Sequence, residues 1–202
     1  MPILGGGMRG YMEIRALLDF LCIAEKLKCN TRHSYTSSGR HESVAEHSWR
    51  LALMAYLVKD EFPETDIDKV IRMCLFHDMG EAVTGDIPAF EKTRKDEAVE
   101  DTAVSRLLEQ LPEPYYGELR ELFREMNEQQ TPEAKLYKAL DKLEALIQHN
   151  EADLSTWIPL EYDLQMTYGT KECSFHKYIN ELRNMVREDS RQKAGMNESD
   201  SN

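Results

Sequence analysis

The amino-acid sequence predicts an all-α fold: a single helical bundle with no significant sheet. Apolar residues recur at spacings of three and four along most of the 202-residue chain, whereas sustained period-2 alternation is hard to find. That length suits one domain built around one core. Hydrophobic residues make up 41% and charged residues 31% of the chain, as in an ordinary globular protein. One α-helical domain is therefore the simplest interpretation.

The domain itself is expected to span residues 11–188. Residues 1–10 include three consecutive glycines and lack the basic and apolar segments of a signal peptide, so they are expected to be a flexible leader or a cloning scar. Residues 189–202 are polar and are expected to form a disordered tail. No apolar run approaches the roughly 20 residues that span a bilayer, so a membrane protein is not expected.

Two helices are predicted in the first third of the chain. The first ends before Asn30 and carries the apolar stripe Ile14, Leu17, Leu18 and Leu21. A polar loop rich in turn residues follows over residues 34–40. Ser43, with Glu46 three residues later, has the signature of a capping box and begins the second helix. The stripe of that helix contains His47, Leu51, Met54, Ala55 and Val58.

The third predicted helix begins at Asp66 and should run through His77 and Asp78. Gly85 is a natural residue to end it, and Pro88 lies just beyond. Its inward-facing residues are expected to be Ile67, Val70, Ile71, Cys74 and Leu75. Further amphipathic helices are expected around residues 104–111, 119–126, 136–147 and 175–186.

The four cysteines indicate a reducing compartment. Cys22, Cys29, Cys74 and Cys173 form no CxxC pair, and Cys22 and Cys74 lie in apolar helical stripes. Such cysteines are usually reduced, buried and small apolar residues, so the protein is expected to be cytoplasmic and free of disulfides.

The charge of the chain restricts its partners. The formal net charge is −12 and no dense cluster of Lys and Arg is present, which argues against a nucleic-acid polymer as partner. A small anionic substrate remains compatible with this charge, because one metal and one or two arginines reverse the potential locally.

Polar residues interrupt two of the apolar stripes. Asp78 lies four residues after Cys74 on the buried face of the third predicted helix, and His77 lies on the flank of that face. His47 shares its stripe with Leu51. A buried carboxylate without a partner costs several kcal/mol, so Asp78 needs a cation, a metal or a network of donors.

Two interpretations of this pattern remain open. A histidine on an apolar face is more often a hydrogen-bonded core residue than a metal ligand, and spacing alone leaves the two about equally favoured here. Glu81 lies one helical turn after His77, where a carboxylate can handle protons on a metal-bound water. Asp86 follows Gly85 and can place a second acid nearby. Taken singly, Glu81 is also typical of a solvated helix residue and Asp86 of a turn former.

The order of His47, His77-Asp78 and Asp141 resembles the H…HD…D signature of the HD-superfamily phosphohydrolases. Three segments are more specific, and they resemble the bacterial 5′-deoxynucleotidase branch, which also contains eukaryotic HD-domain proteins. They are Glu42 to Ser48, His77 to Pro88 with the text EAVTGDIP, and Asp141 to Ala145. The matching motifs lie between residues 28 and 145 in the expected order.

The resemblance implies a helical HD domain, one divalent cation and hydrolysis of a nucleoside 5′-monophosphate to nucleoside and phosphate. The four implied metal ligands are His47, His77, Asp78 and Asp141. The cation can be Mn, Co, Fe, Zn or Mg, because mixed nitrogen and oxygen ligands admit each of them. The assignment of Asp141 depends on the family match alone. A homodimer is a further implication of the resemblance.

The resemblance also implies roles for four residues around the metal. Glu81 and Asp86 match the catalytic acids of the family, and Arg32 matches its phosphate-contacting arginine. The next residue is His33, where the nucleotidases carry a tryptophan that senses the 2′ position of the sugar. This departure puts a preference for deoxyribose in doubt and leaves the hydrolytic residues unaffected.

Three other functions remain open from the sequence. The same metal core serves other phosphoesters, so a nucleoside triphosphate or a cyclic nucleotide is an alternative substrate. The chain lacks obvious additional basic residues for a triphosphate. A non-catalytic nucleotide-binding module is disfavoured because every expected acid and ligand is present. A purely structural helical interaction protein is the least favoured, and it would bind no stoichiometric metal.

Overall fold

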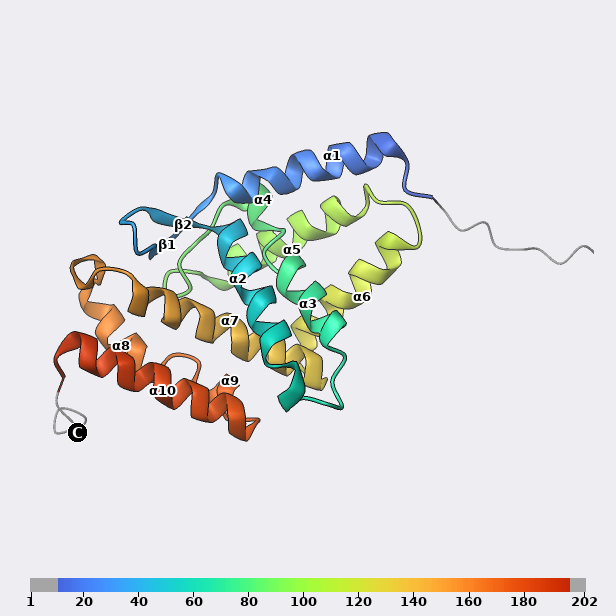
Figure 1. Cartoon of the computed structure of the whole chain (residues 1–202). Helices are drawn as coiled ribbons and strands as arrows, with labels where there is room; N and C mark the ends of the chain where they lie inside the picture. Colours follow the sequence, from blue (N-terminus) through green and yellow to red (C-terminus); the bar gives the residue numbers. More distant parts are fainter. Residues whose placement is uncertain (1–10, 197–202) are drawn as a thin grey trace, which may run out of the picture.

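The computed structural model describes residues 11–196, and the predicted all-α class is confirmed, with one small hairpin in addition (Figure 1). Its elements in chain order are α1 (Ile14–Ala24), the 3-10 helix η1 (Glu25–Lys28), β1 (Thr31–Tyr35), β2 (His41–Ser43), α2 (Val44–Leu57), η2 (Lys59–Glu61), α3 (Ile67–Phe76), α4 (Glu81–Thr84), α5 (Arg94–Leu108), α6 (Tyr115–Glu128), α7 (Pro132–Glu151), η3 (Leu154–Thr156), α8 (Pro159–Thr167), α9 (Thr170–Cys173) and α10 (Lys177–Ala194).

The hairpin surrounds the segment predicted as a polar loop: residues 36–40 form its turn, and only Ser34 and Tyr35 of the predicted loop belong to a strand. β1 and β2 pair antiparallel, with Thr31 opposite Ser43 and Tyr35 opposite His41. Gly39 has a φ of +83° in the connecting turn, a conformation that favours glycine. Strands of five and three residues are too short to give a period-2 signal, so the pattern could not reveal them. The hairpin fixes Arg32 and His33 as consecutive residues of β1.

Helix α7 is the centre of the bundle. In Figure 1 it runs between the α2–α3 pair and the layer formed by α8 and α10. Leu136, Leu140 and Leu143 of α7 are completely buried, and they join Leu51 of α2 and Met73 of α3 in one apolar cluster. Because α2, α3 and α7 share this cluster, the polar residues near it on all three helices are held close together.

The apolar stripe predicted for the first helix is not its buried face, so that prediction is wrong. Ile14 and Leu21 are 78% and 52% exposed, and Cys22 is exposed as well. Helix α1 lies along the outside of the bundle and packs through the face that carries Phe20 and Ile23. Both faces of this helix are apolar, so periodicity alone could not show which one contacts the core.

The predicted starts of α2 and α3 are confirmed. The Ser43 hydroxyl accepts from the Glu46 N–H, and the Glu46 carboxylate accepts from the Ser43 N–H at 2.9 Å, which completes the capping box. The Asp66 carboxylate accepts from the Lys69 N–H at the start of α3. Leu75, predicted to face inward, is instead 46% exposed.

The third predicted helix is interrupted at His77 and Asp78, two of the predicted metal ligands. α3 ends at Phe76, residues 77–80 form a turn, and α4 begins at Glu81. In the turn, the N–H groups of Met79 and Glu81 bond to carbonyls three residues back rather than four. Asp78 therefore lies in a tight turn and not on a helical stripe. Gly85, with a φ of +78°, ends α4 as predicted.

The C-terminal part of the chain is more helical than predicted. α10 continues to Ala194, so residues 189–194 of the expected tail are helical, and α8 and α9 were not predicted. The expected leader, residues 1–10, and residues 197–202 of the expected tail lie outside the described residues. No helix within residues 11–196 is both long and apolar enough to cross a membrane. All four cysteines are free, and Cys74 is buried as predicted.

Replacing Leu140 with alanine is expected to lower the free energy of unfolding by about 2–5 kcal/mol. The side chain is completely buried at the centre of α7, and its removal leaves a cavity among rigid neighbours. Leu57 of α2 is 70% exposed and provides the control, for which a change within about 0.5 kcal/mol is expected. Urea unfolding of the two variants checks this prediction, and equal losses would contradict the central position of α7.

Candidate metal centre

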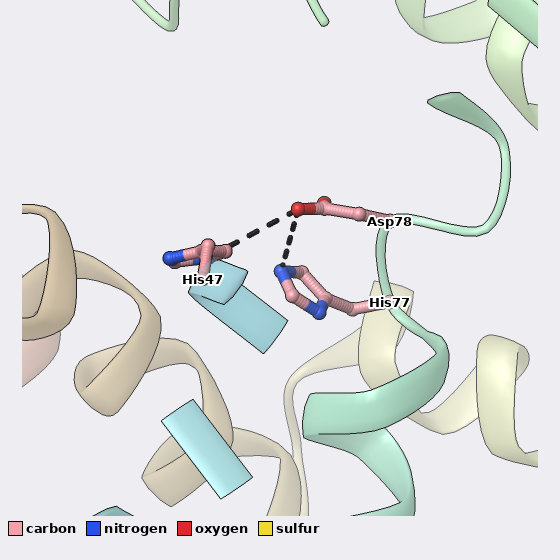
Figure 2. A group of neighbouring side chains, drawn as sticks. All are labelled: His47, His77 and Asp78. Carbon is pink, nitrogen blue, oxygen red and sulfur yellow. Dashed lines mark ion pairs between the residues drawn. The ribbon is translucent and has the colours of Figure 1, made fainter. Parts of the chain in front are cut away.

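The four predicted ligands converge in space from helices α2 and α7 and from the turn that follows α3. The His47 Nε2 atom lies 3.3 Å from Asp141 Oδ1 and 4.0 Å from Asp78 Oδ2. The His77 Nε2 atom lies 3.0 Å from Asp78 Oδ2 and 3.8 Å from Asp141 Oδ1. Figure 2 shows the Asp78 carboxylate directed at the two imidazoles. Residues that are up to 94 positions apart thus present two nitrogens and two oxygens to one point.

Hydrogen bonds orient both imidazoles. The His77 Nδ1 atom donates to the Cys74 carbonyl oxygen at 2.9 Å, which leaves a lone pair on Nε2 of the neutral ring. The His47 Nδ1 atom pairs with the fully buried Glu144 carboxylate. Arg50 in turn donates to that carboxylate at 2.7 Å. Histidines that bind a metal through one ring nitrogen usually donate the N–H of the other nitrogen to a carboxylate or carbonyl oxygen in this way.

Lysines orient the carboxylate of Asp141. Lys138 Nζ lies 2.9 Å from Asp141 Oδ2, and Lys142 Nζ lies 3.8 Å from the same oxygen, so Oδ1 is the oxygen nearer the two histidines. Burial acts to raise the pKa of Asp141, but the two lysines and the histidines hold it well below its usual range. Asp141 was assigned from the family resemblance alone, and the structure places it beside the two histidines.

The donor set fits a divalent cation. The Nε2 atoms of His47 and His77 and Oδ2 of Asp78 are buried, and none has a hydrogen-bond partner within residues 11–196. The ligand atoms of these three residues lie within 4.8 Å of one another, as in a group that could hold an ion. Burial lowers the pKa of His47, but Glu144 and Asp141 outweigh burial and raise it to about 9. The surroundings therefore stabilise positive charge at this point.

Arg32 of β1 lies at the edge of the four-residue cluster. Its Nη1 atom is 3.6 Å from Asp78 Oδ2, and its Nε atom is 3.4 Å from Glu42 Oε2. Burial opposes the charged form, but Asp78 and the other surrounding carboxylates raise the pKa of Arg32 above its ordinary value. The guanidinium is thus a fixed positive charge beside the candidate ligands.

Glu81 and Asp86 are two further carboxyls beside the cluster, and burial and Asp78 act to raise the pKa of each while Arg32 acts to lower it. Glu81 is 4% exposed, and its Oε2 atom is buried with no hydrogen bond from the described residues. Burial, together with the carboxylates of Asp78 and Asp86, raises the pKa of Glu81 to about 10. Burial also raises the pKa of Asp86. A carboxyl that retains its proton near neutral pH is suited to general acid catalysis.

The site opens into a cleft of about 640 Å³, which Arg32, Asp78, Glu81, Asp86 and Asp141 all line. These five residues, which the sequence predicted to belong to one site, therefore lie on one concave surface. His33 lies elsewhere: it lines a smaller adjoining cavity and is not among the residues of the cleft.

Sequence reasoning missed three residues that support the site. Glu144 and Arg50 hold His47 from behind, and the buried Glu42 contacts Arg32. A signal existed for Glu144, because it follows Leu140 by four residues on the buried stripe of α7. Glu42 lies in the matching segment Glu42 to Ser48, but its contact with Arg32, like the contact of Arg50 with Glu144, joins different elements and has no signal in the local spacing.

A helical bundle with two histidines and two aspartates in this order defines an HD-domain protein. The family model for the HD domain matches residues 24–183, which is most of the chain. The chain belongs to the HD-domain family, as the sequence motifs predicted.

The relatives specify the branch. Human 5′-deoxynucleotidase HDDC2 is 37% identical over 141 residues, a match that covers 68% of each chain. The crystal structure of a protein described as a predicted metal-dependent phosphohydrolase, from Magnetospirillum magnetotacticum, superposes with a TM-score of 0.77. That match has 27% identity and covers 91% of this chain and 95% of the other. A conserved hypothetical protein from Pyrococcus furiosus gives a TM-score of 0.66 at 29% identity, covering 86% of this chain and 99% of the other. The predicted resemblance to the 5′-deoxynucleotidase branch is confirmed.

Proposed function

We propose that this protein is a metal-dependent phosphomonoesterase that hydrolyses (deoxy)nucleoside 5′-monophosphates to a nucleoside and inorganic phosphate. The observation that carries the proposal is the convergence of His47, His77, Asp78 and Asp141 beside a cleft that Arg32 and Glu81 line. Membership of the HD-domain family and the 5′-deoxynucleotidase relatives support the same reaction.

The four converging residues would hold the cation through two imidazole nitrogens and two carboxylate oxygens. When bound, the cation supplies Lewis acidity: it lowers the pKa of a water and offsets charge on the phosphoryl oxygens. The mixed donor set accepts Mn, Co, Fe, Zn or Mg and favours the transition metals among them.

Arg32 would hold the phosphate. Its guanidinium is fixed between Asp78 and Glu42, so it faces the candidate ligands without the entropy loss of ordering a free side chain. A planar guanidinium can donate two parallel hydrogen bonds to a phosphate, and it neutralises charge that the acidic chain would otherwise repel. Positioning and charge neutralisation are the main requirements of phosphoryl transfer.

Glu81 and Asp86 would manage protons and place the leaving 5′-oxygen. Without a cation, Glu81 retains a proton near neutral pH because burial and two neighbouring carboxylates raise its pKa. A positive charge held beside Asp78 would lower that pKa toward the range in which a carboxyl both gives and takes a proton. Glu81 is therefore our candidate for the acid that protonates the nucleoside oxygen as the P–O bond breaks.

A phosphate-release screen tests the proposed function. Purified protein is supplied with Mn, Co, Fe, Zn or Mg in turn and offered every ribo- and deoxyribonucleoside 5′-monophosphate. Release of inorganic phosphate with at least one metal is expected. Including both sugars addresses the departure at His33. Release of pyrophosphate or triphosphate from nucleoside triphosphates, with no reaction of monophosphates, would instead support the alternative substrate class.

Replacing Glu144 with glutamine is expected to weaken metal affinity by about 10–100-fold. The carboxylate holds the Nδ1 atom of His47 and accepts from Arg50, so the amide would leave both less firmly held. Glu151 also pairs with Arg50 but is not in contact with His47, which makes Glu151→Gln the matched control. Titration of metal-free protein with Co measures both variants. Equal affinities in the two variants would remove Glu144 from the support of the site.

A further inference from the structure

A smaller cavity adjoins the cleft that contains the candidate ligands. Its volume is about 280 Å³, close to the lower end of the roughly 300–1,000 Å³ typical of small-molecule pockets. Arg32, Asp86, Ala89 and Tyr168 line both the cavity and the cleft, so the two spaces share a wall. A molecule whose phosphate faces Arg32 can therefore extend its other end into the cavity.

A cluster of three polar residues from three elements lines the cavity. His33 Nε2 of β1 lies 3.0 Å from Glu161 Oε1 of α8, and His149 Nε2 of α7 lies 3.3 Å from the same oxygen. Glu161 is 2% exposed, and its other oxygen accepts from the Ile158 N–H at 2.7 Å. The ring of Phe90 meets the ring of His33 edge-on, with 5.5 Å between their centres.

The hydrogen-bonding capacity of this cluster is only partly used. Oε1 of Glu161 and Nε2 of His33 are both buried and lie within ion-pair distance of each other, but within residues 11–196 neither forms a hydrogen bond of good geometry. Buried polar groups that lack such bonds are costly, so their retention calls for an explanation. A cation does not supply one, because the groups in residues 11–196 spaced to hold an ion do not include this trio.

The remaining lining of the cavity suits a flat ring. Pro88, Phe90, Leu146 and Leu164 provide apolar surface, while His149, Glu161 and Gln165 provide donors and acceptors. Nucleobases are bound in this way, by stacking on aromatic or apolar side chains and by hydrogen bonds along their edges. Burial lowers the pKa of His149, so its ring is neutral near pH 7 and offers one donor and one acceptor.

We propose that the nucleoside part of the substrate lies in this cavity and that Glu161, with His33 and His149, determines which nucleobase is accepted. The inference rests on the proposed function, because a nucleotide links the two adjoining spaces. His149 and Glu161 line the cavity and not the cleft, so they contact the part of the nucleotide remote from phosphate. A site with fixed polar groups discriminates strongly against a ligand that leaves them unpaired.

The test is the variant Glu161→Gln, which preserves shape and can still accept from the Ile158 N–H. Values of kcat/KM are measured for the 5′-monophosphates of deoxyadenosine, deoxyguanosine, deoxycytidine and thymidine. The ratio between the best and the poorest base is expected to change by at least about 10-fold, the worth of one hydrogen bond. The change should lie mainly in KM, because the reacting groups are in the adjoining cleft.

Asp163→Asn is the matched control, because Asp163 is an exposed acid two residues along the same helix. Its four kcat/KM values should equal those of the wild type. His149→Asn is a second variant that should also change the base ratio, and thermal unfolding shows whether each variant is folded. An unchanged ratio, or an equal loss with all four bases in folded variants, overturns the proposal.

Binding of free nucleosides separates this inference from the proposed function. Calorimetry with the four deoxynucleosides reports on the cavity without any turnover. If the wild type hydrolyses no monophosphate, the proposed function fails. The cavity is then judged by whether nucleosides bind the wild type and whether Glu161→Gln changes their order of affinity. Absence of nucleoside binding together with an unchanged order of kcat/KM would overturn the assignment of the cavity.

Discussion

Replacing Glu81 with glutamine is expected to lower kcat for phosphate release by about 10²–10⁴-fold, the usual contribution of general acid–base catalysis. The amide keeps the shape of the side chain but does not ionise, so it cannot donate a proton to the leaving group. Glu81 is not among the four converging donors, so metal content should stay near that of the wild type. Phosphate release and elemental analysis on the same preparation check both parts.

Glu118→Gln is the control, because Glu118 is an exposed acid on α6, outside the residues that line the cleft. Full activity is expected for this variant. Wild-type turnover in Glu81→Gln would remove Glu81 from the mechanism. Loss of metal in that variant would instead make Glu81 part of the metal site.

The same substitution has a pH-dependent effect on stability. In the metal-free protein, burial and the carboxylates of Asp78 and Asp86 raise the pKa of Glu81 from 4.5 to about 10. The folded state therefore favours the protonated form, so this contribution to stability is complete below pH 4.5 and declines as the pH rises toward 10. Metal-free Glu81→Gln should thus gain stability over the wild type at pH 8 and lose that advantage near pH 4.

Replacing His77 with alanine is expected to remove stoichiometric metal and to lower phosphate release by at least about 10³-fold. The substitution removes a nitrogen whose orientation the Cys74 carbonyl fixes toward Asp78 and Asp141. The remaining three donors leave the cation incompletely held. Metal content by elemental analysis and turnover with added Mn measure the two effects.

His41→Ala is the matched control, because it removes an exposed imidazole from β2, away from the cluster. This variant should keep its metal and its activity. Thermal unfolding of both variants without metal separates loss of a ligand from loss of the fold. A folded His77→Ala variant that retains full metal would contradict the assignment of His77 as a ligand.

The helical class could be predicted from sequence because its signals are local. The capping box at Ser43 and the cap at Asp66 depend on residues three positions apart, and both are observed. The buried face of α1 and the break after Phe76 could not be predicted. They depend on packing against distant elements and on the turn that places Asp78 beside two histidines.

The sequence predicted the residues of the candidate site but not the neighbouring residues that hold them in place. The motifs named His47, His77, Asp78 and Asp141, and the structure brings them together, while their role as ligands remains a prediction. The contact of Glu144 with His47 joins residues 97 positions apart. No spacing rule covers such a pair.

The cluster of His33, His149 and Glu161 could likewise not be predicted from local sequence. His33 was singled out by its place after Arg32, but its partner Glu161 lies on α8, a helix that periodicity did not reveal. Glu161 alone resembles an ordinary acid in the first turn of a helix, where carboxylates are common. Only its burial against two imidazoles from other elements distinguishes it.

Elemental analysis of protein purified without chelators tests the central claim most directly. If two imidazoles and two carboxylates hold a cation in the helical interior, about one divalent metal per chain should be found, or should bind when Co or Mn is added to metal-free protein. Phosphate release should then depend on that metal. A folded protein that contains no metal, binds neither Co nor Mn and hydrolyses nothing in their presence would contradict the account.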